Sequence, residues 1–123
     1  MSKILSAHLL HIVSATRYSL AGLAAAFRDE MAFRQICLVC VAGFPAAFLA
    51  GADWVEAMLL IFPLALAVVV ELLNTAVESV VDRVSKELHP LAKKAKDTAS
   101  AAQFCAQILI AVVWGSFFIR KLL

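Results

Sequence analysis

The sequence has little charge and little glycine. Charged residues are 16% of the 123 residues, apolar residues are 63%, and only four glycines are present. Soluble domains carry roughly 25% charged residues, so this balance is typical of a membrane protein. The chain also lacks a G-x-x-x-x-G-K-[ST] pattern, which excludes a Walker-type phosphate loop. Without an internal repeat or a linker, residues 1–123 are expected to form one domain.

Charge is absent altogether from three stretches of the chain. No charged residue interrupts Gln35 to Ala52, Ala57 to Val70 or Thr98 to Ile119. A helix needs roughly 20 apolar residues to cross a bilayer, and the middle stretch is short only because Glu71 ends it. The sequence therefore predicts an all-α integral membrane protein with transmembrane helices at 31–52, 54–83 and 96–120. The second helix is expected to extend into the cytoplasm, and a turn is expected over Lys86 to Pro90.

The first 28 residues follow a different pattern. Their apolar residues recur near helical spacing: Ile4, Leu5, Leu9, Ile12, Val13, Leu20, Leu23 and Phe27. This pattern predicts an amphipathic helix over 1–28 that lies on the membrane surface. Arg17 and Arg28 interrupt its apolar residues, so no cleaved secretory signal is expected.

The basic residues gather beside the apolar stretches. They precede the first span and fill the loop before the third, whereas only Asp53 and Glu56 lie between the first two spans. By the positive-inside rule, the N-terminus and the second loop are expected in the cytoplasm, although Arg120 and Lys121 then fall outside. The net charge of +2 is thus interpreted as a topology signal, and no nucleic-acid partner is expected.

A polar stripe runs along the second predicted span. Glu71, Asn74, Glu78 and Asp82 are spaced by 3, 4 and 4 residues, which places them on one face of a helix. Counted at 1.5 Å per residue from Ala57, Glu71 lies roughly 21 Å into a core about 30 Å thick. A carboxylate at that depth costs about 2.5–3.5 kcal/mol on insertion scales, which favours a functional role over a structural ion pair.

Glu30 adds an acid where the surface helix meets the first span. Mg²⁺ is commonly held by one or two carboxylates together with substrate phosphates, so Glu30 and Glu78 beside Lys94 and Lys96 suit a nucleoside triphosphate. Three classes remain open on these grounds. They are a phosphoryl-transfer enzyme at the inner interface, a small proton-coupled transporter that uses Glu71, and a structural subunit of a membrane complex.

The amino-acid sequence of this region resembles the prokaryotic diacylglycerol kinase family. The residues that carry the resemblance are Glu71-Leu72-Leu73-Asn74-Thr75-Ala76-Val77-Glu78, then Val81-Asp82-Arg83, and then His89-Pro90-Leu91-Ala92-Lys93-Lys94-Ala95-Lys96-Asp97. It extends back through Glu30 to Gln35 and Tyr18 to Leu23, and so covers nearly the whole chain. The E-x-x-N-x-A-x-E-x-x-V-D pattern followed by A-K-D is specific.

The resemblance implies a homotrimeric, multi-pass lipid kinase of the bacterial inner membrane, with active sites between subunits near the cytoplasmic face. It implies that ATP and Mg²⁺ are used, with Glu71 as the general base and Glu30 and Glu78 as metal-binding acids. The remaining implied site residues are Asn74 and Lys96 for catalysis, Arg17, Tyr18, Glu30, Glu78, Lys96 and Asp97 for the nucleotide, and Ser100 with Glu71 for the lipid.

The same resemblance leaves the lipid open. Diacylglycerol, giving phosphatidic acid, is the expected acceptor, and undecaprenol is the alternative within the family because its kinases share these motifs. A basic residue is expected near position 11, where this chain has His11, and Arg17 is expected to contact phosphate in its place.

Overall fold

The computed structural model describes residues 2–84 and 86–123, with side chains from Ile4 onward. It contains four helices, α1 (Ser2–Asp29), α2 (Met31–Ala50), α3 (Trp54–Val84) and α4 (Pro90–Leu122). The all-α fold expected from the sequence is confirmed. By length and composition α2, α3 and α4 could each cross a membrane, which confirms three candidate spans.

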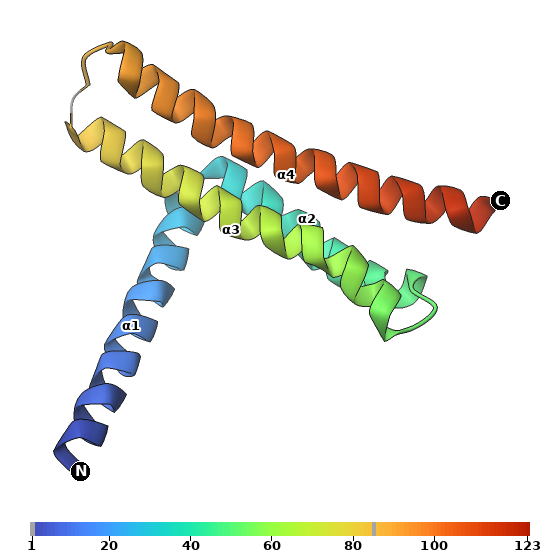
Figure 1. Ribbon diagram of the computed structural model, residues 1–123, viewed down its shortest axis with the longest axis horizontal. Helices are drawn as coiled ribbons and strands as arrows, with labels where there is room; N and C mark the ends of the chain where they lie inside the picture. Colours follow the sequence, from blue (N-terminus) through green and yellow to red (C-terminus); the bar gives the residue numbers. More distant parts are fainter. Residues whose placement is uncertain (1, 85) are drawn as a thin grey trace.

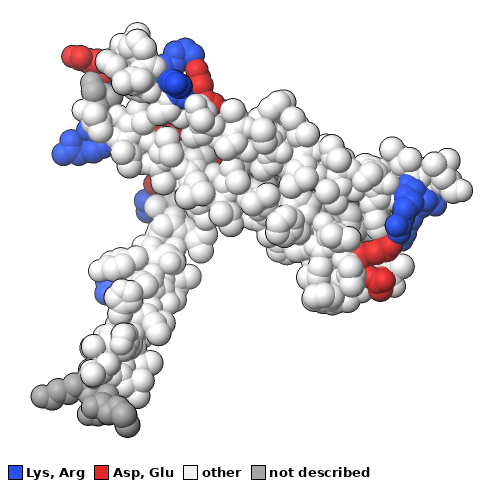
Figure 2. Space-filling view, viewed as in Figure 1, with Lys and Arg blue, Asp and Glu red and all other residues white. Residues whose placement is uncertain are grey.

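Helix α3 lies at the centre of the arrangement. It packs against α2 on one side and α4 on the other, whereas α1 leaves the start of α2 at a steep angle and points away from the other three (Figure 1). On the face shown in Figure 2, charged side chains gather at the two ends of this bundle and along α1, and the surface between is uncharged. An uncharged belt between two charged ends is the surface that a bilayer requires.

Glu30 is the single residue that separates α1 from α2. Its extended backbone, with φ −109° and ψ 117°, turns the chain between the two helices. The Arg34 guanidinium then donates to the backbone oxygens of Phe27 and Arg28, at 3.1 and 2.8 Å. The last carbonyls of a helix have no partner within it, so Arg34 caps α1 and fixes its direction relative to α2.

The opposite end of α2 meets α3 in a tight loop, which together with the last turns of α4 is called the distal end below. A side chain at Gly51 would bring its Cβ within 2.9 Å of the Ala57 backbone nitrogen, so only glycine fits there. The Asp53 carboxylate then accepts from the Glu56 backbone N–H at 2.9 Å and caps α3. α2 thus ends at Ala50, two residues before the end of the span predicted at 31–52.

The turn between α3 and α4 is called the hairpin end. Residues 86–89 are not helical, which confirms the turn expected there, except that Pro90 already belongs to α4. The His89 ring Nδ1 accepts from the Leu91 backbone N–H at 3.1 Å, and proline suits the first position of a helix. These two residues start α4 ahead of the span predicted at 96–120.

The core of the bundle lies where α2, α3 and α4 meet. Its buried members are Ile36, Cys40, Leu64, Ala67 and Ala106. Cys40 donates its thiol to the Leu64 carbonyl, with sulfur and oxygen 3.7 Å apart, and the Trp114 ring nitrogen donates to the Leu60 carbonyl at 3.0 Å. Most large apolar side chains of the three spans are exposed outside this core, as expected of surfaces in contact with lipid.

Candidate active site

Glu71 is the buried carboxylate of the molecule. Its residue is only 3% exposed although it lies midway along α3 among apolar neighbours. Glu78 and Glu30 are both close enough to act electrostatically on its carboxylate. The structure therefore places two of the acids that the sequence singled out, Glu30 from the α1–α2 junction and Glu78 from α3, within electrostatic range of Glu71.

Glu30 differs from its neighbour Asp29. Arg28 donates two hydrogen bonds to the Asp29 carboxylate, at 2.9 and 3.0 Å, and this pairing lowers the Asp29 pKa from its ordinary value. Asp29 is exposed, whereas Glu30 is half-buried at the helix junction and within electrostatic range of Glu71. Of the two adjacent acids, Glu30 is thus the one positioned to hold a ligand.

Lys96 stands beside Glu78 at the hairpin end of the seam between α3 and α4. Its ammonium donates to the Asp82 carboxylate at 2.5 Å, and Glu78 also acts on it electrostatically. Asp82 was placed on the acidic stripe, but its pairing with Lys96 across two helices could not be read from the sequence. A lysine held between two acids is positioned near any phosphate that these acids bind through a metal ion.

Beside the expected Asn74, the site region includes Gln103, which the sequence analysis did not single out. The Oδ1 atom of Asn74 and both amide atoms of Gln103 are buried without a hydrogen-bond partner in the described part of the chain. An unpaired polar group buried in this way destabilises a protein by about 1–3 kcal/mol. Gln103 was missed because it lies inside an uncharged stretch. The sequence indicated it only in that Gln103 is polar and lies seven positions after Lys96, on the same helical face.

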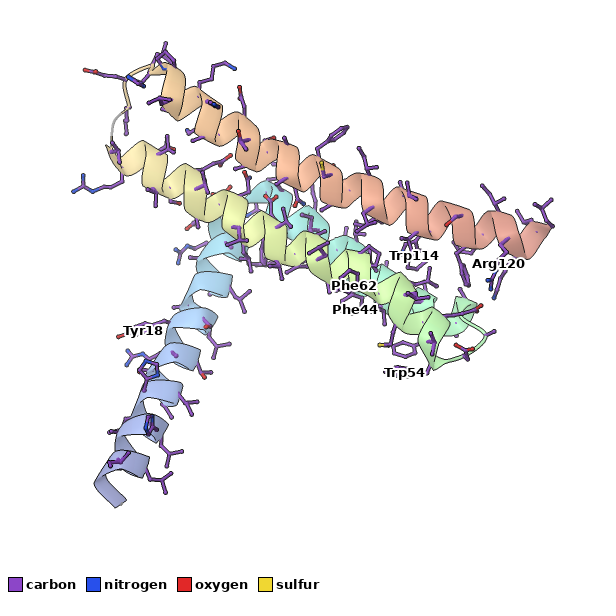
Figure 3. The ribbon with its side chains drawn as sticks, in the orientation of Figure 1. Tyr18, Phe44, Trp54, Phe62, Trp114 and Arg120 are labelled. Carbon is purple, nitrogen blue, oxygen red and sulfur yellow. The ribbon has the colours of Figure 1, made fainter. Side chains whose placement is uncertain are left out.

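Other predicted site residues lie outside this cluster. Arg17 and Tyr18 are exposed on α1, and Figure 3 shows Tyr18 away from the three spans. Asp97 is exposed and pairs with Lys93. Ser100 is exposed on α4. Within one chain the structure thus brings together the acids, Asn74 and Lys96, but not the residues expected to contact the nucleotide from α1.

Two open grooves flank α3 at this level. One, of about 550 Å³, runs between α1 and α3 and has Asp29, Glu30, Thr75 and Ser79 among its lining residues, with Asp29 held by Arg28. The other, of about 650 Å³, lies between α3 and α4 and is mostly apolar, with Asn74, Lys94 and Thr98 as its polar residues. The first groove, with a carboxylate and hydroxyls in its lining, suits a polar ligand, and the second, with its mostly apolar lining, suits a lipid.

The donor atoms suit a hard cation. In the described residues no three His, Cys, Asp or Glu side chains come close enough to hold a metal ion by themselves. The candidate ligands are the two carboxylates of Glu30 and Glu78. Mg²⁺ commonly uses one or two protein carboxylates and completes its shell with waters and substrate phosphates. The site therefore fits a metal that arrives with a nucleotide better than a resident one.

Comparison with known proteins agrees with this chemistry. The family model described as prokaryotic diacylglycerol kinase matches residues 17–118. A diacylglycerol kinase of Pseudomonas aeruginosa is 54% identical over 108 residues, which cover 88% of each chain. Relatives of the same name in Haemophilus influenzae and Escherichia coli K12 are 43% and 40% identical, over 87% and 84% of this chain and 91% and 84% of their own.

Proposed function

This chain belongs to the prokaryotic diacylglycerol kinase family, and on that basis we propose that it transfers the γ-phosphoryl group of ATP to diacylglycerol, giving phosphatidic acid. The protein is a multi-pass membrane enzyme. The observation that carries the proposal is the burial of Glu71 on a candidate span, within electrostatic range of Glu30 and Glu78. A transporter or a purely structural subunit would not need the acids, Asn74 and Lys96 together at one end of the bundle.

Glu71 acts as the general base in this proposal. It lies deepest among the acids, where the hydroxyl of a lipid can reach it from the bilayer. The carboxylate accepts the hydroxyl proton as the oxygen attacks the γ-phosphorus, and the bond from that phosphorus to the β,γ-bridging oxygen breaks. Asn74, one turn along α3, orients the reacting groups through its amide.

Glu30, Glu78 and Lys96 hold the nucleotide at the water-facing end. Glu30 and Glu78 would hold Mg²⁺, which when bound supplies charge neutralisation on the phosphates. Lys96 exchanges part of its interaction with Asp82 for a phosphate oxygen, and Asp97 supports it from the next position. Phosphoryl transfer depends mainly on positioning and electrostatics, which these side chains provide.

Arg17 and Tyr18 complete the site from another subunit. Because α1 points away from the bundle of its own chain, its exposed residues are available to a neighbouring copy. The proposed enzyme is a homotrimer with active sites between subunits. Mixing impaired Arg17→Gln subunits with inactive Glu71→Gln subunits should restore part of the activity, because in this proposal Arg17 and Glu71 of one site come from different chains. No recovery after verified subunit exchange indicates that both come from one chain.

The proposed location is the bacterial inner membrane, with α1 on the cytoplasmic surface. With three spans, a cytoplasmic N-terminus puts Leu123 on the outside. A reporter active only in the periplasm and fused after Leu123 should give signal. A signal only from a cytoplasmic reporter at that position rejects this orientation.

The test of the function compares two lipid acceptors. Purified protein with radiolabelled ATP and Mg²⁺ should label diacylglycerol faster than undecaprenol offered at the same concentration. Faster labelling of undecaprenol would reassign the substrate within the family, and no labelling of either would reject the kinase proposal.

A further inference from the structure

Gln103 is buried with its hydrogen-bonding capacity unused. The residue is 6% exposed, and within the described residues neither Nε2 nor Oε1 has a partner. Its helix neighbours do not explain this, because Ala106 one turn away belongs to the apolar core. A polar side chain that is more than nine-tenths buried and unpaired commonly marks a place where water or a ligand belongs.

Two contacts fix which residues of α3 lie opposite Gln103. At the hairpin end the Lys96 ammonium reaches Asp82, at 2.5 Å. At the distal end the Trp114 ring nitrogen reaches the Leu60 carbonyl, at 3.0 Å. The two helices run in opposite directions between these contacts (Figure 1), so positions in between follow by proportion.

Gln103 falls at the level of the proposed general base. It lies seven residues after the first contact on α4 and eleven before the second. The same fraction of the way along α3, counted from Asp82 toward Leu60, falls between Glu71 and Asn74. Both helices therefore contribute buried polar groups to one layer: the Glu71 carboxylate, the Asn74 amide and the Gln103 amide.

This layer borders the apolar groove between α3 and α4. Asn74 lines that groove, and so do Ala99 and Ala102, which lie one turn before Gln103 and next to it. A lipid in the groove would present its polar end to the amides and its chains to Val70 and Leu73.

The chemistry of an amide distinguishes between lipid alcohols. A polyprenol has one hydroxyl and otherwise only hydrocarbon, so it has no second oxygen that could accept from Gln103 while its hydroxyl donates to Glu71 and attacks the γ-phosphorus. A diacylglycerol carries ester carbonyls beside its hydroxyl, and these accept hydrogen bonds. A site with a buried donor rejects a ligand that leaves the donor unpaired.

We propose that Gln103 determines lipid specificity, its Nε2 donating to an ester carbonyl of the acceptor lipid while the lipid hydroxyl meets Glu71. This assignment rests on the proposed lipid kinase function. It predicts that the enzyme distinguishes diacylglycerol from a dialkylglycerol, which has the same hydroxyl and chains but ether linkages without carbonyl groups.

The experiment compares these two lipids in mixed micelles with wild-type protein and Gln103→Met. Methionine keeps the length of the side chain and removes its polar atoms, so it fits the apolar interior. Wild type should show a KM about tenfold lower for diacylglycerol, the factor of one good hydrogen bond. Gln103→Met should raise that KM to nearly the dialkylglycerol value, with kcat and the dialkylglycerol KM unchanged.

Gln107→Met is the matched control. Gln107 is the same residue type one turn farther along α4, exposed and lining a different cavity, so its replacement should leave the lipid preference intact. An unchanged preference in Gln103→Met overturns the inference, and so does an equal loss on both lipids, which indicates a structural role. If wild type phosphorylates neither lipid, the kinase proposal itself has failed.

Discussion

The distal end of the bundle and its middle layer satisfy their polar groups to different degrees. At the distal end, the Glu56 carboxylate accepts from the Ala52 backbone N–H and from Arg120, and the Trp114 ring donates to the Leu60 carbonyl. Figure 3 shows Trp114 and Arg120 projecting from α4 toward the other helices there. At the level of Glu71, Asn74 and Gln103, by contrast, buried amide atoms are unpaired in the described part of the chain.

This difference indicates that one part of the bundle contributes mainly to stability and another mainly to function. A protein is most stable when its buried polar groups are paired, as at the distal end, whereas a binding site keeps such groups available for its ligand. We therefore expect substitutions around Glu71, Asn74 and Gln103 to alter catalysis with little effect on folding, and substitutions at the distal end to do the reverse.

The largest expected effect is that of Glu71→Gln. Loss of the general base should lower kcat at least about a hundredfold even at saturating Mg²⁺, because positioned acid–base groups contribute 10²–10⁴-fold. MgATP binding should stay nearly intact, since Glu71 lies on the lipid side of the site. Steady-state kinetics and equilibrium nucleotide binding on the folded variant measure the two quantities. Loss of MgATP binding would move Glu71 to the metal site.

Glu30→Gln and Glu78→Gln should weaken nucleotide binding about tenfold or more, which corresponds to at least about 1.4 kcal/mol. Each removes one oxygen ligand that water can replace, so high Mg²⁺ should restore part of the affinity. Titration of MgATP at several Mg²⁺ concentrations measures this. Asp29→Asn is the matched control, because Asp29 is paired with Arg28. Insensitivity to Mg²⁺ would contradict the ligand role.

Trp114→Phe tests the distal end. It removes the hydrogen bond to Leu60 and part of the ring packing, and should lower the free energy of unfolding by about 1–2 kcal/mol. The KM for either substrate should not change. Reversible unfolding in mixed micelles, with activity assayed on the refolded protein, gives both values. A large change in kcat with normal stability would show that the two ends are coupled.

The smallest expected effect is that of Arg120→Gln. Its guanidinium pairs with Glu56 at an exposed position, and pairs of this kind contribute roughly 0–1 kcal/mol. Glu56 keeps its hydrogen bond from the Ala52 backbone, so the loop stays capped. The substitution should therefore lower the free energy of unfolding by less than about 1 kcal/mol. The difference from wild type should become smaller still at high salt, where the wild-type ion pair is screened. A loss above about 2 kcal/mol would indicate a buried pair.

The sequence alone determined the features that depend on local order. Three helices long enough to cross a bilayer follow from three apolar stretches, because helix length and hydropathy are set residue by residue. The shared face of Glu71, Asn74 and Glu78 follows from helical spacing. The family followed from motifs that lie in consecutive residues, and the comparisons confirmed it.

Only the tertiary structure decided what lies between helices. It paired Lys96 with Asp82, brought Glu30 within electrostatic range of Glu71, and buried Gln103 at the level of Glu71. None of these follows from spacing, because the register of α4 against α3 depends on how side chains from both helices interlock. A polar residue in an apolar helix could equally face lipid, core or substrate, and packing alone fixes which of the three it faces.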